Sequence, residues 1–365
     1  MKSKLADICD FAKEKTDVSG LDENRYISTE NMMPNKGGIT RATNLPSTVQ
    51  TQAFSAEDTL VSNIRPYFRK IWYAQSNGGC SNDVLVFRRK KNVHPRFLYY
   101  VLADDAFFDY ATSTSKGTKM PRGDKQAIMN YPVPNISWDE QHKIAEILSN
   151  IDGKIEINTA INKNLAEQIQ SLLSKLLSNS QADLARLGEY LYIKGRIGWK
   201  GLKKKEYLDH SQYRIINGES LTKNGIDWDK AGYISEERYL ESPEIMLKIG
   251  DILMSKDGTI GKIGYVDSLD MPTSVASGIF VIRNQQPDII STVFIYFLFQ
   301  SSWFNQFITA RTEGSVIPHL YQKDFMEFEF PMPSSDDMKK FGDITKPMFD
   351  TIVLKLPTPI TGVDP

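Results

Sequence analysis

The strongest constraint on how this chain folds is an internal repeat. Five motifs occur in the first half and again, in the same order and at a nearly constant offset, in the second half. One such match is common among α/β sequences, whereas five in register indicate a duplicated domain. The pairs are an apolar run into a turn (Asp58–Asn63 and Asp251–Lys256), a short strand ending in arginine (Asn82–Arg88 and Ser277–Arg283), an aromatic helix (Pro95–Leu102 and Val293–Phe299), a Gly/Ser/Thr loop (Ser115–Pro121 and Glu313–His319) and a closing Pro-x-Pro (Tyr131–Pro134 and Phe330–Pro333).

A long helix is predicted between the two copies. Ser137 and Glu140 form a capping-box pattern, and no proline follows within 138–178. Apolar residues and two asparagines then recur at alternating spacings of three and four residues, so they form one stripe, or seam, along the helix. Such a seam is typical of a helix that packs on another helix. At 1.5 Å per residue the helix is roughly 60 Å long. We interpret its seam as a helix–helix or partner interface, made by Ile144, Leu148, Ile151, Ile155, Asn158, Asn162, Leu165, Ile169, Leu172 and Leu176.

The second copy of this helix is predicted to be shorter. Ser334–Asp337 repeats the capping pattern, but Pro347 lies within the helix and should bend or break it. Pro357 and Pro359 then end it. The second helix therefore covers about half of the first. The sequence identifies no partner within the chain for the seam beyond Ile155.

These patterns predict an α+β fold with two similar mixed α/β domains separated by long, coiled-coil-forming helices. The expected boundaries are a first domain at 1–137, the long helix at 138–180, a second domain at 181–333, a short distal helix at 334–356 and a tail at 357–365.

Three stretches resemble the specificity (S) subunit of type I restriction-modification enzymes over about 1–355. They are Asn63-Ile-Arg-Pro-Tyr, Gly314-Ser-Val-Ile-Pro-His-Leu with Asp324-Phe, and Glu140-Gln-His-Lys-Ile-Ala-Glu-Ile-Leu-Ser-Asn-Ile-Asp leading into the seam. The resemblance implies a non-catalytic chain with two target recognition domains, each reading half of a split double-stranded DNA target. Two methyltransferase (M) subunits would dock on the helices, and restriction (R) subunits would join through them. S-adenosylmethionine, ATP and Mg would bind only in those partners, and this chain would hold no cofactor or metal.

The short second helix departs from the family, in which the spacer helices form an antiparallel pair. We therefore expect Asn162–Leu176 to be buried either against a second copy of the chain or against a methyltransferase subunit.

Loop residues are the candidates for DNA contact, because binding requires both phosphate neutralisation and base-edge readout. The basic segment 194–205 holds six Lys or Arg and no acid, although a solvated surface loop would have the same composition. The other candidate loops follow the apolar strands or the aromatic helices. For the loops after the strands the alternative is a structural turn, and for those after the helices it is a phosphate contact or no contact. Two further loops, at 31–38 and 217–220, could reach the groove. The candidates are Arg65, Arg69, Lys70, Lys116, Thr118, Lys119, Arg122, Arg196, Lys200, Lys203, Lys204, Lys256, Thr259, Ser315 and His319.

The composition disfavours an enzyme and a membrane protein. The four histidines are scattered, the two cysteines are unpaired in spacing, and neither GxxxxGK[ST] nor GxGxxG is present. No signal peptide or membrane span is visible, and the low cysteine content fits a reducing cytoplasm. The net charge of −1 combines basic loops with acidic stretches. The remaining alternative is a coiled-coil interaction or scaffold protein without sequence-specific DNA binding, which would show the same helix but not the paired basic loops.

Overall fold

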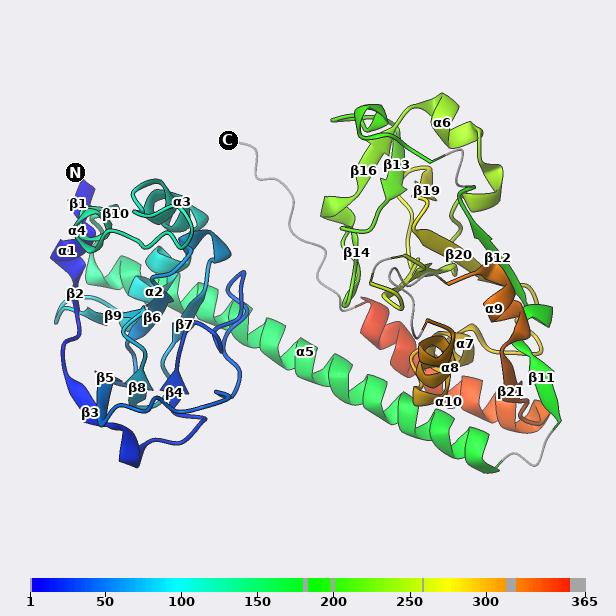
Figure 1. Cartoon of the computed structure of the whole chain (residues 1–365), viewed down its shortest axis with the longest axis horizontal. Coiled ribbons are helices and arrows are strands. Elements are labelled where there is room, and N and C mark those ends of the chain that lie inside the picture. The colour runs from blue at the N-terminus through cyan, green and yellow to red at the C-terminus, as the bar shows by residue number, and fades with distance from the viewer. Residues whose placement is uncertain (1, 180–182, 198–200, 258, 313–319, 355–365) are drawn as a thin grey trace. The chain divides into compact units, whose positions relative to one another are not determined.

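The computed structural model describes residues 2–179, 183–197, 201–257, 259–312 and 320–354. The chain divides into two compact units, Met1–Glu156 and Ile157–Pro365, so that the long helix α5 (Trp138–Asn179) contributes its first part to one unit and its last part to the other (Figure 1). Among the described helices, none is both long enough and apolar enough to cross a bilayer.

Unit 1 is built on two four-stranded sheets. The antiparallel sheet has the order β2-β9-β6-β7, and the mixed sheet has the order β3-β5-β8-β4, in which only β4 and β8 run parallel. The elements are β1 (Lys2–Lys4), α1 (Leu5–Ile8), β2 (Cys9–Phe11), β3 (Lys15–Asp17), β4 (Tyr26–Ile27), β5 (Gln50–Phe54), β6 (Thr59–Ser62), β7 (Ile71–Tyr73), β8 (Gly78–Cys80), β9 (Val84–Arg89), α2 (Pro95–Ala103), α3 (Asp105–Ser113), α4 (Lys125–Met129) and β10 (Pro132–Pro134).

Unit 2 repeats this topology. Its antiparallel sheet β12-β20-β17-β18 has the same order, β11-β21 corresponds to β1-β10, and the sheet β16-β13-β19 again holds one parallel pair. The predicted duplication and α+β class are therefore confirmed. The elements are β11 (Leu184–Arg186), β12 (Leu191–Gly195), β13 (Tyr213–Ile216), β14 (Leu221–Thr222), β15 (Gly225–Ile226), β16 (Gly232–Ile234), α6 (Glu236–Leu240), β17 (Ile252–Ser255), β18 (Ile263–Tyr265), β19 (Thr273–Val275), β20 (Ile279–Asn284), α7 (Thr292–Leu298), α8 (Ser302–Thr312), α9 (Gln322–Glu327), β21 (Glu329–Pro331) and α10 (Ser335–Leu354).

An ion pair between a buried aspartate and a partly exposed arginine stands at the same place in each copy. Arg88 donates from Nε and Nη2 to the two carboxylate oxygens of Asp58, at 2.9 and 2.7 Å. Arg283 donates to Asp251 in the same way, at 2.6 and 2.7 Å. Each aspartate precedes the central strand β6 or β17, and each arginine lies on the neighbouring strand, so the pair fixes the strand that leads into a candidate DNA-contacting loop.

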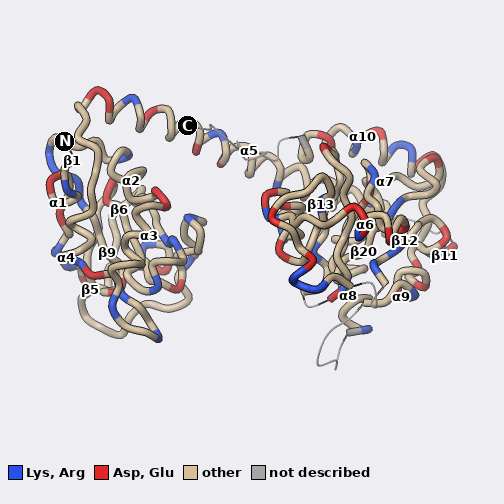
Figure 2. Tube along the Cα trace, turned by 90° about the horizontal axis from the view of Figure 1, so that it is seen from above, with Lys and Arg blue, Asp and Glu red and all other residues tan. Residues whose placement is uncertain are grey.

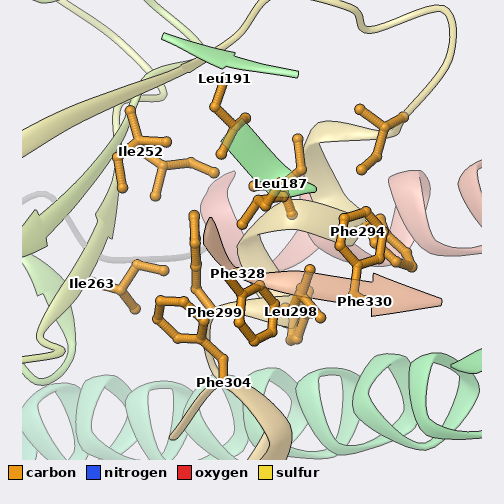
Figure 3. Close-up of a cluster of buried hydrophobic side chains, with 14 of the residues drawn as sticks. Leu187, Leu191, Ile252, Ile263, Phe294, Leu298, Phe299, Phe304, Phe328 and Phe330 are labelled. Atoms are coloured by element: carbon orange, nitrogen blue, oxygen red, sulfur yellow. The ribbon is translucent and has the colours of Figure 1, made fainter. Parts of the chain in front are cut away.

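The last part of α5 lies in the core of unit 2. Ile169, Leu173 and Leu177 are buried in one cluster with Phe341 and Phe349 of α10. Figure 3 shows α5 running along one side of this cluster, below the aromatic side chains of α7, α8 and β21. The prediction that the seam beyond Ile155 has no partner within the chain was therefore wrong. The prediction that another chain buries this part of the seam was also wrong at Ile169, which is buried within unit 2. Aromatic residues distant in sequence cover the seam.

Helix α10 is continuous through Pro347. The capping pattern at its start is confirmed, since the Asp337 N–H donates to Ser334 Oγ at 3.1 Å. Pro347 lies on the exposed face of α10. Because proline has no N–H, the carbonyl of Asp343 receives no helical hydrogen bond, and at this exposed position it can bond to water instead. The predicted break at Pro347 was therefore wrong, although α10 has 20 residues against 42 in α5.

Candidate nucleic-acid interface

Three loops meet beyond the end of β6 in unit 1, and backbone hydrogen bonds join them. The Arg65 N–H donates to the carbonyl of Pro121, and Ile64 and Arg122 form a β-bridge. The N–H groups of Asn35 and Lys36 donate to the carbonyls of Phe68 and Arg69, each at 2.8 Å. The candidates predicted at 65–70 and 116–122, and the loop 31–38, are thus brought together.

Four non-glycine residues of this cluster adopt left-handed backbone conformations. Their φ angles are 54° at Asn35, 60° at Lys36, 50° at Arg65 and 52° at Arg69. Each costs about 1–2 kcal/mol relative to a right-handed conformation. Such strain persists only where the surroundings impose it, and it is commonly found at functional sites. The cross-loop hydrogen bonds supply that constraint, so the loops form a preorganised surface.

Several of the predicted cations are paired with acids in the free protein. Arg69 contacts Asp105 at 2.8 Å and Asp109 at 3.4 Å, and Arg122 contacts Asp83 at 3.0 Å. These pairs are largely exposed and contribute little to stability, so phosphates can replace the carboxylates.

The other predicted cations of this loop cluster differ in whether their charged groups are already bonded within the protein. Lys116 pairs with Asp124. The Lys70 ammonium donates to the carbonyl of Thr29 at 2.6 Å, and burial lowers its pKa. Arg65 and Lys119 make no ion pair with any described residue. Thr118 lies between Lys116 and Lys119 in the same exposed loop.

A cavity of about 270 Å³ opens beside this loop cluster. Arg65 and Lys70 line it together with the carboxylate-bearing Glu30, and Phe68, Ile64 and Met120 supply apolar surface. Phe68 is 38% exposed and Met120 is 47% exposed. Tyr67 is also exposed, and its ring contacts that of Phe68 in a tilted arrangement with 4.8 Å between the centroids. The sequence reasoning missed Tyr67, Phe68 and Met120; the only local signal was two aromatic residues directly after the turn proline Pro66.

Unit 2 repeats the arrangement at the end of β17. Lys256 donates its N–H to the carbonyl of Gly278 and accepts from the N–H of Leu320, just as Asn63 donates to Asp83 and accepts from Gly123 in unit 1. Thr259 is exposed, and its carbonyl accepts from Ser255 Oγ at 2.6 Å. Ser315 and His319 lie outside the described residues.

The basic segment begins at the end of β12, where Gly195 pairs with Phe280 of β20. The ammonium of Lys256 lies 5.0 Å from the ring centroid of the same Phe280, so the start of the segment is close to Lys256. Arg196, however, is 1% exposed. It donates to the carbonyl of Val275 at 3.2 Å and to Ser242 and Ser274 at 3.4 Å, and desolvation lowers its pKa. The predicted DNA contact at Arg196 is therefore corrected: this buried guanidinium anchors the segment and does not face solvent.

Lys203 and Lys204 are exposed at the start of the short 3-10 helix Lys204–Glu206, whereas Lys200 lies outside the described residues. Figure 2 shows basic and acidic residues interspersed along the described parts of both units. Within the described ranges, no cluster of three or more His, Cys, Asp or Glu residues could hold a metal ion.

The first part of α5 presents an apolar stripe to solvent. Ile144, Ile147, Ile151 and Ile155 are between 38% and 60% exposed, while Ala145 on another face is buried in unit 1. Leu148, Asn158, Asn162 and Leu165 are half-buried, and the Asn162 side-chain oxygen is buried without a hydrogen-bond donor among the described residues. Leu172 and Leu176 pack on the core of unit 2. The predicted seam is therefore covered at its end and exposed at its beginning.

Two copies of one α+β domain, each with a cation-bearing loop anchored at the end of its central strand and a share of one long helix, define a duplicated two-domain protein. The family profile described as type I restriction modification DNA specificity domain matches residues 1–167 and 186–359. The chain belongs to this family of specificity subunits, which are non-catalytic.

Individual relatives are distant. The MjaVIII specificity subunit of Methanocaldococcus jannaschii is 24% identical over 302 residues, which cover 75% of this chain and 68% of that protein. The MjaIX specificity subunit of the same organism is 21% identical over 285 residues, covering 72% of this chain and 64% of that protein. The crystal structure of the type I restriction-modification S subunit from M. genitalium matches 97% of this chain and 90% of its own, with a TM-score of 0.59 and 18% identity, which shows a shared fold.

Proposed function

We propose that the chain selects a bipartite double-stranded DNA target, and that each unit reads one half of it through the loops at the end of β6 or β17. The observation that carries this proposal is the repeated loop geometry: Asn63 and Lys256 make the same pair of backbone hydrogen bonds in their two units. A loop whose first residue is held by the same two backbone bonds in both copies, with cations around it, fits recognition of two DNA half-sites better than a structural turn does.

The proposed contacts combine the sequence candidates with the structure. Arg65, Lys119 and Arg122 would approach base edges or phosphates in one half-site, and Lys203, Lys204, Lys256 and Thr259 in the other. Because α5 contributes to both units, we infer that it sets the separation of the two half-sites. The target is then two short specific sequences with a spacer of fixed length.

The exposed stripe on α5 is the proposed docking surface for a methyltransferase subunit. Ile147 of α5 and Ile344 of α10 hold corresponding positions in the repeat, and both are more than half exposed. A duplicated site of this kind fits two copies of one partner. Restriction subunits would join through those partners, which would also bind S-adenosylmethionine, ATP and Mg, and the complex would act in the cytoplasm. Self-association through α5 is the competing use of this stripe.

The test is DNA binding by the chain assembled with its methyltransferase subunits. The assembled complex should retain a subset of a random DNA pool, and sequencing should give a two-part motif. Each phosphate contact should contribute a slope of about −0.9 to the dependence of log affinity on log salt concentration. A complex that forms through α5 but retains no DNA at low salt would favour the scaffold alternative.

A further inference from the structure

The cavity beside Arg65 has a chemical character that general DNA binding does not explain. Six of its lining residues divide into three kinds: the cations Arg65 and Lys70, the acid Glu30, and the apolar group Ile64, Phe68 and Met120. A surface that binds only phosphates requires the first kind and gains nothing from the other two.

Arg65 offers hydrogen-bond donors to a ligand. Its Nε is shielded from solvent and has no acceptor among the described residues, so the N–H groups that a ligand can reach are those of the two terminal nitrogens. A guanidinium carries five N–H donors in a planar fork, which match either a phosphate or the O6 and N7 atoms of guanine.

Glu30 decides between those two acceptors. Its carboxylate lines the same cavity, and a carboxylate repels a phosphate at close range. The major-groove edge of a base pair carries no net charge, and it presents amino groups that a carboxylate can accept from. Lys70 also lines the cavity, but its ammonium already donates to the carbonyl of Thr29 at 2.6 Å. An acid beside the cations therefore favours base edges over phosphates.

The apolar wall supplies a second element of readout. Phe68 and Met120 keep 38% and 47% of their surface exposed on a loop cluster that is otherwise tightly hydrogen-bonded. In the major groove only thymine presents a methyl group, and apolar side chains are its usual contacts.

We propose that this cavity reads a guanine next to a thymine in the half-site of unit 1, with Arg65 bonded to guanine and Phe68 and Met120 packed on the thymine methyl group. This inference rests on the proposed function and adds the base class. The left-handed conformation of Arg65 and its N–H bond to Pro121 hold the backbone of Arg65 beside the apolar wall before DNA binds, so less ordering is needed to form the two contacts together.

The first experiment measures binding of the assembled complex to its selected target with single-atom changes in the DNA. Thymine-to-uracil replacement should weaken binding about 3- to 5-fold, the value of one buried methyl group. Replacing guanine by 7-deazaguanine should weaken it about 5- to 20-fold, since one of two bonds to Arg65 is lost. Met120→Ala should abolish the sensitivity to uracil. Met33→Ala is the matched control: Met33 is 41% exposed in the same loop cluster but does not line the cavity, and its variant should retain that sensitivity.

The second experiment uses Arg65→Gly. Glycine adopts the φ of 50° without strain, so the thermal unfolding midpoint should stay the same or rise while affinity for the target falls at least 5-fold more than affinity for scrambled DNA. Equal losses on both DNAs would reassign Arg65 to a phosphate. A selected half-site without adjacent guanine and thymine, or uracil sensitivity that survives Met120→Ala, would overturn the inference and leave the proposed function intact. A complex that selects no DNA would instead refute the proposed function.

Discussion

Asp251→Ala should destabilise unit 2 strongly, because this carboxylate is fully buried and has three donors. Arg283 Nε and Nη2 and the Lys248 N–H reach it at 2.6, 2.7 and 2.7 Å. Removing one partner of a buried pair costs about 3–5 kcal/mol, since the other charge stays buried without compensation. Arg283 keeps only 25% of its side chain exposed. The expected loss in the free energy of unfolding of unit 2 is therefore about 3–5 kcal/mol.

The corresponding change in unit 1 should cost less. Arg88 has a second acid, Glu14, at 2.8 Å, and Glu14 stays in place when Asp58 is replaced by Ala. We expect a loss smaller by about 1–2 kcal/mol than in unit 2. Double replacement Asp251→Leu with Arg283→Met should restore most of the stability, because an apolar pair of similar volume leaves no unpaired charge.

Hydrogen exchange measured peptide by peptide at increasing denaturant separates the two units. Arg186→Ala is the matched control, since its 3.2 Å pair with Glu329 is exposed at 65% and 44%, and its loss should stay below about 1 kcal/mol. The reasoning fails if Asp251→Ala costs no more than this control, or no more than Asp58→Ala.

Three further predictions concern partners, DNA and thiols. Ile147→Glu places a charge on the exposed stripe of α5 and should reduce co-purification of methyltransferase subunits at least 10-fold, whereas Ile249→Glu, at a similarly exposed isoleucine, should not. Arg122→Ala should weaken binding to the selected target by about 1–3 kcal/mol and to scrambled DNA by less; equal losses would indicate a phosphate contact. Burial raises the pKa of both Cys9 and Cys80 to about 12 from 9.0, so both thiols should resist alkylation at pH 8 until unit 1 unfolds. Because the raised values belong to the folded state, the stability of unit 1 should be intact below pH 9 and should fall from pH 9 to pH 12; rapid native alkylation would contradict this burial.

The duplicated fold was readable from the sequence because both copies keep the residues that define it. Asp58 with Arg88, and Asp251 with Arg283, were visible as repeated motif ends, and the structure shows that each pair bonds in the same way. The caps of α5 and α10 were also readable, because a capping box depends on residues three positions apart.

Long-range packing was not readable. Arg196 lies in a basic, glycine-rich run like that of a surface loop, and only the fold brings Ser242, Ser274 and Val275 around it. Similarly, the sequence did not show that Pro347 lies on the solvent-exposed face of α10, where the helix tolerates it.

The heptad seam of α5 predicted which face of the helix makes contacts, but not what packs against that face. Ile169 is covered by aromatic residues of unit 2, whereas Ile147 on the same stripe is exposed. The periodicity is the same in both parts, because spacing along a helix reports which side chains share a face and says nothing of what packs on it.

The central claim is that each unit reads one half of a split DNA target. It is tested most directly by mapping methylated bases genome-wide in cells that carry this chain with its methyltransferase partners, and again after the loop at 116–122 is exchanged for that of a relative. The account predicts a two-part motif with a fixed spacer, of which the exchange alters one half and leaves the other half and the spacer unchanged. An undivided motif, a change in both halves, or methylation that does not depend on this chain would contradict it.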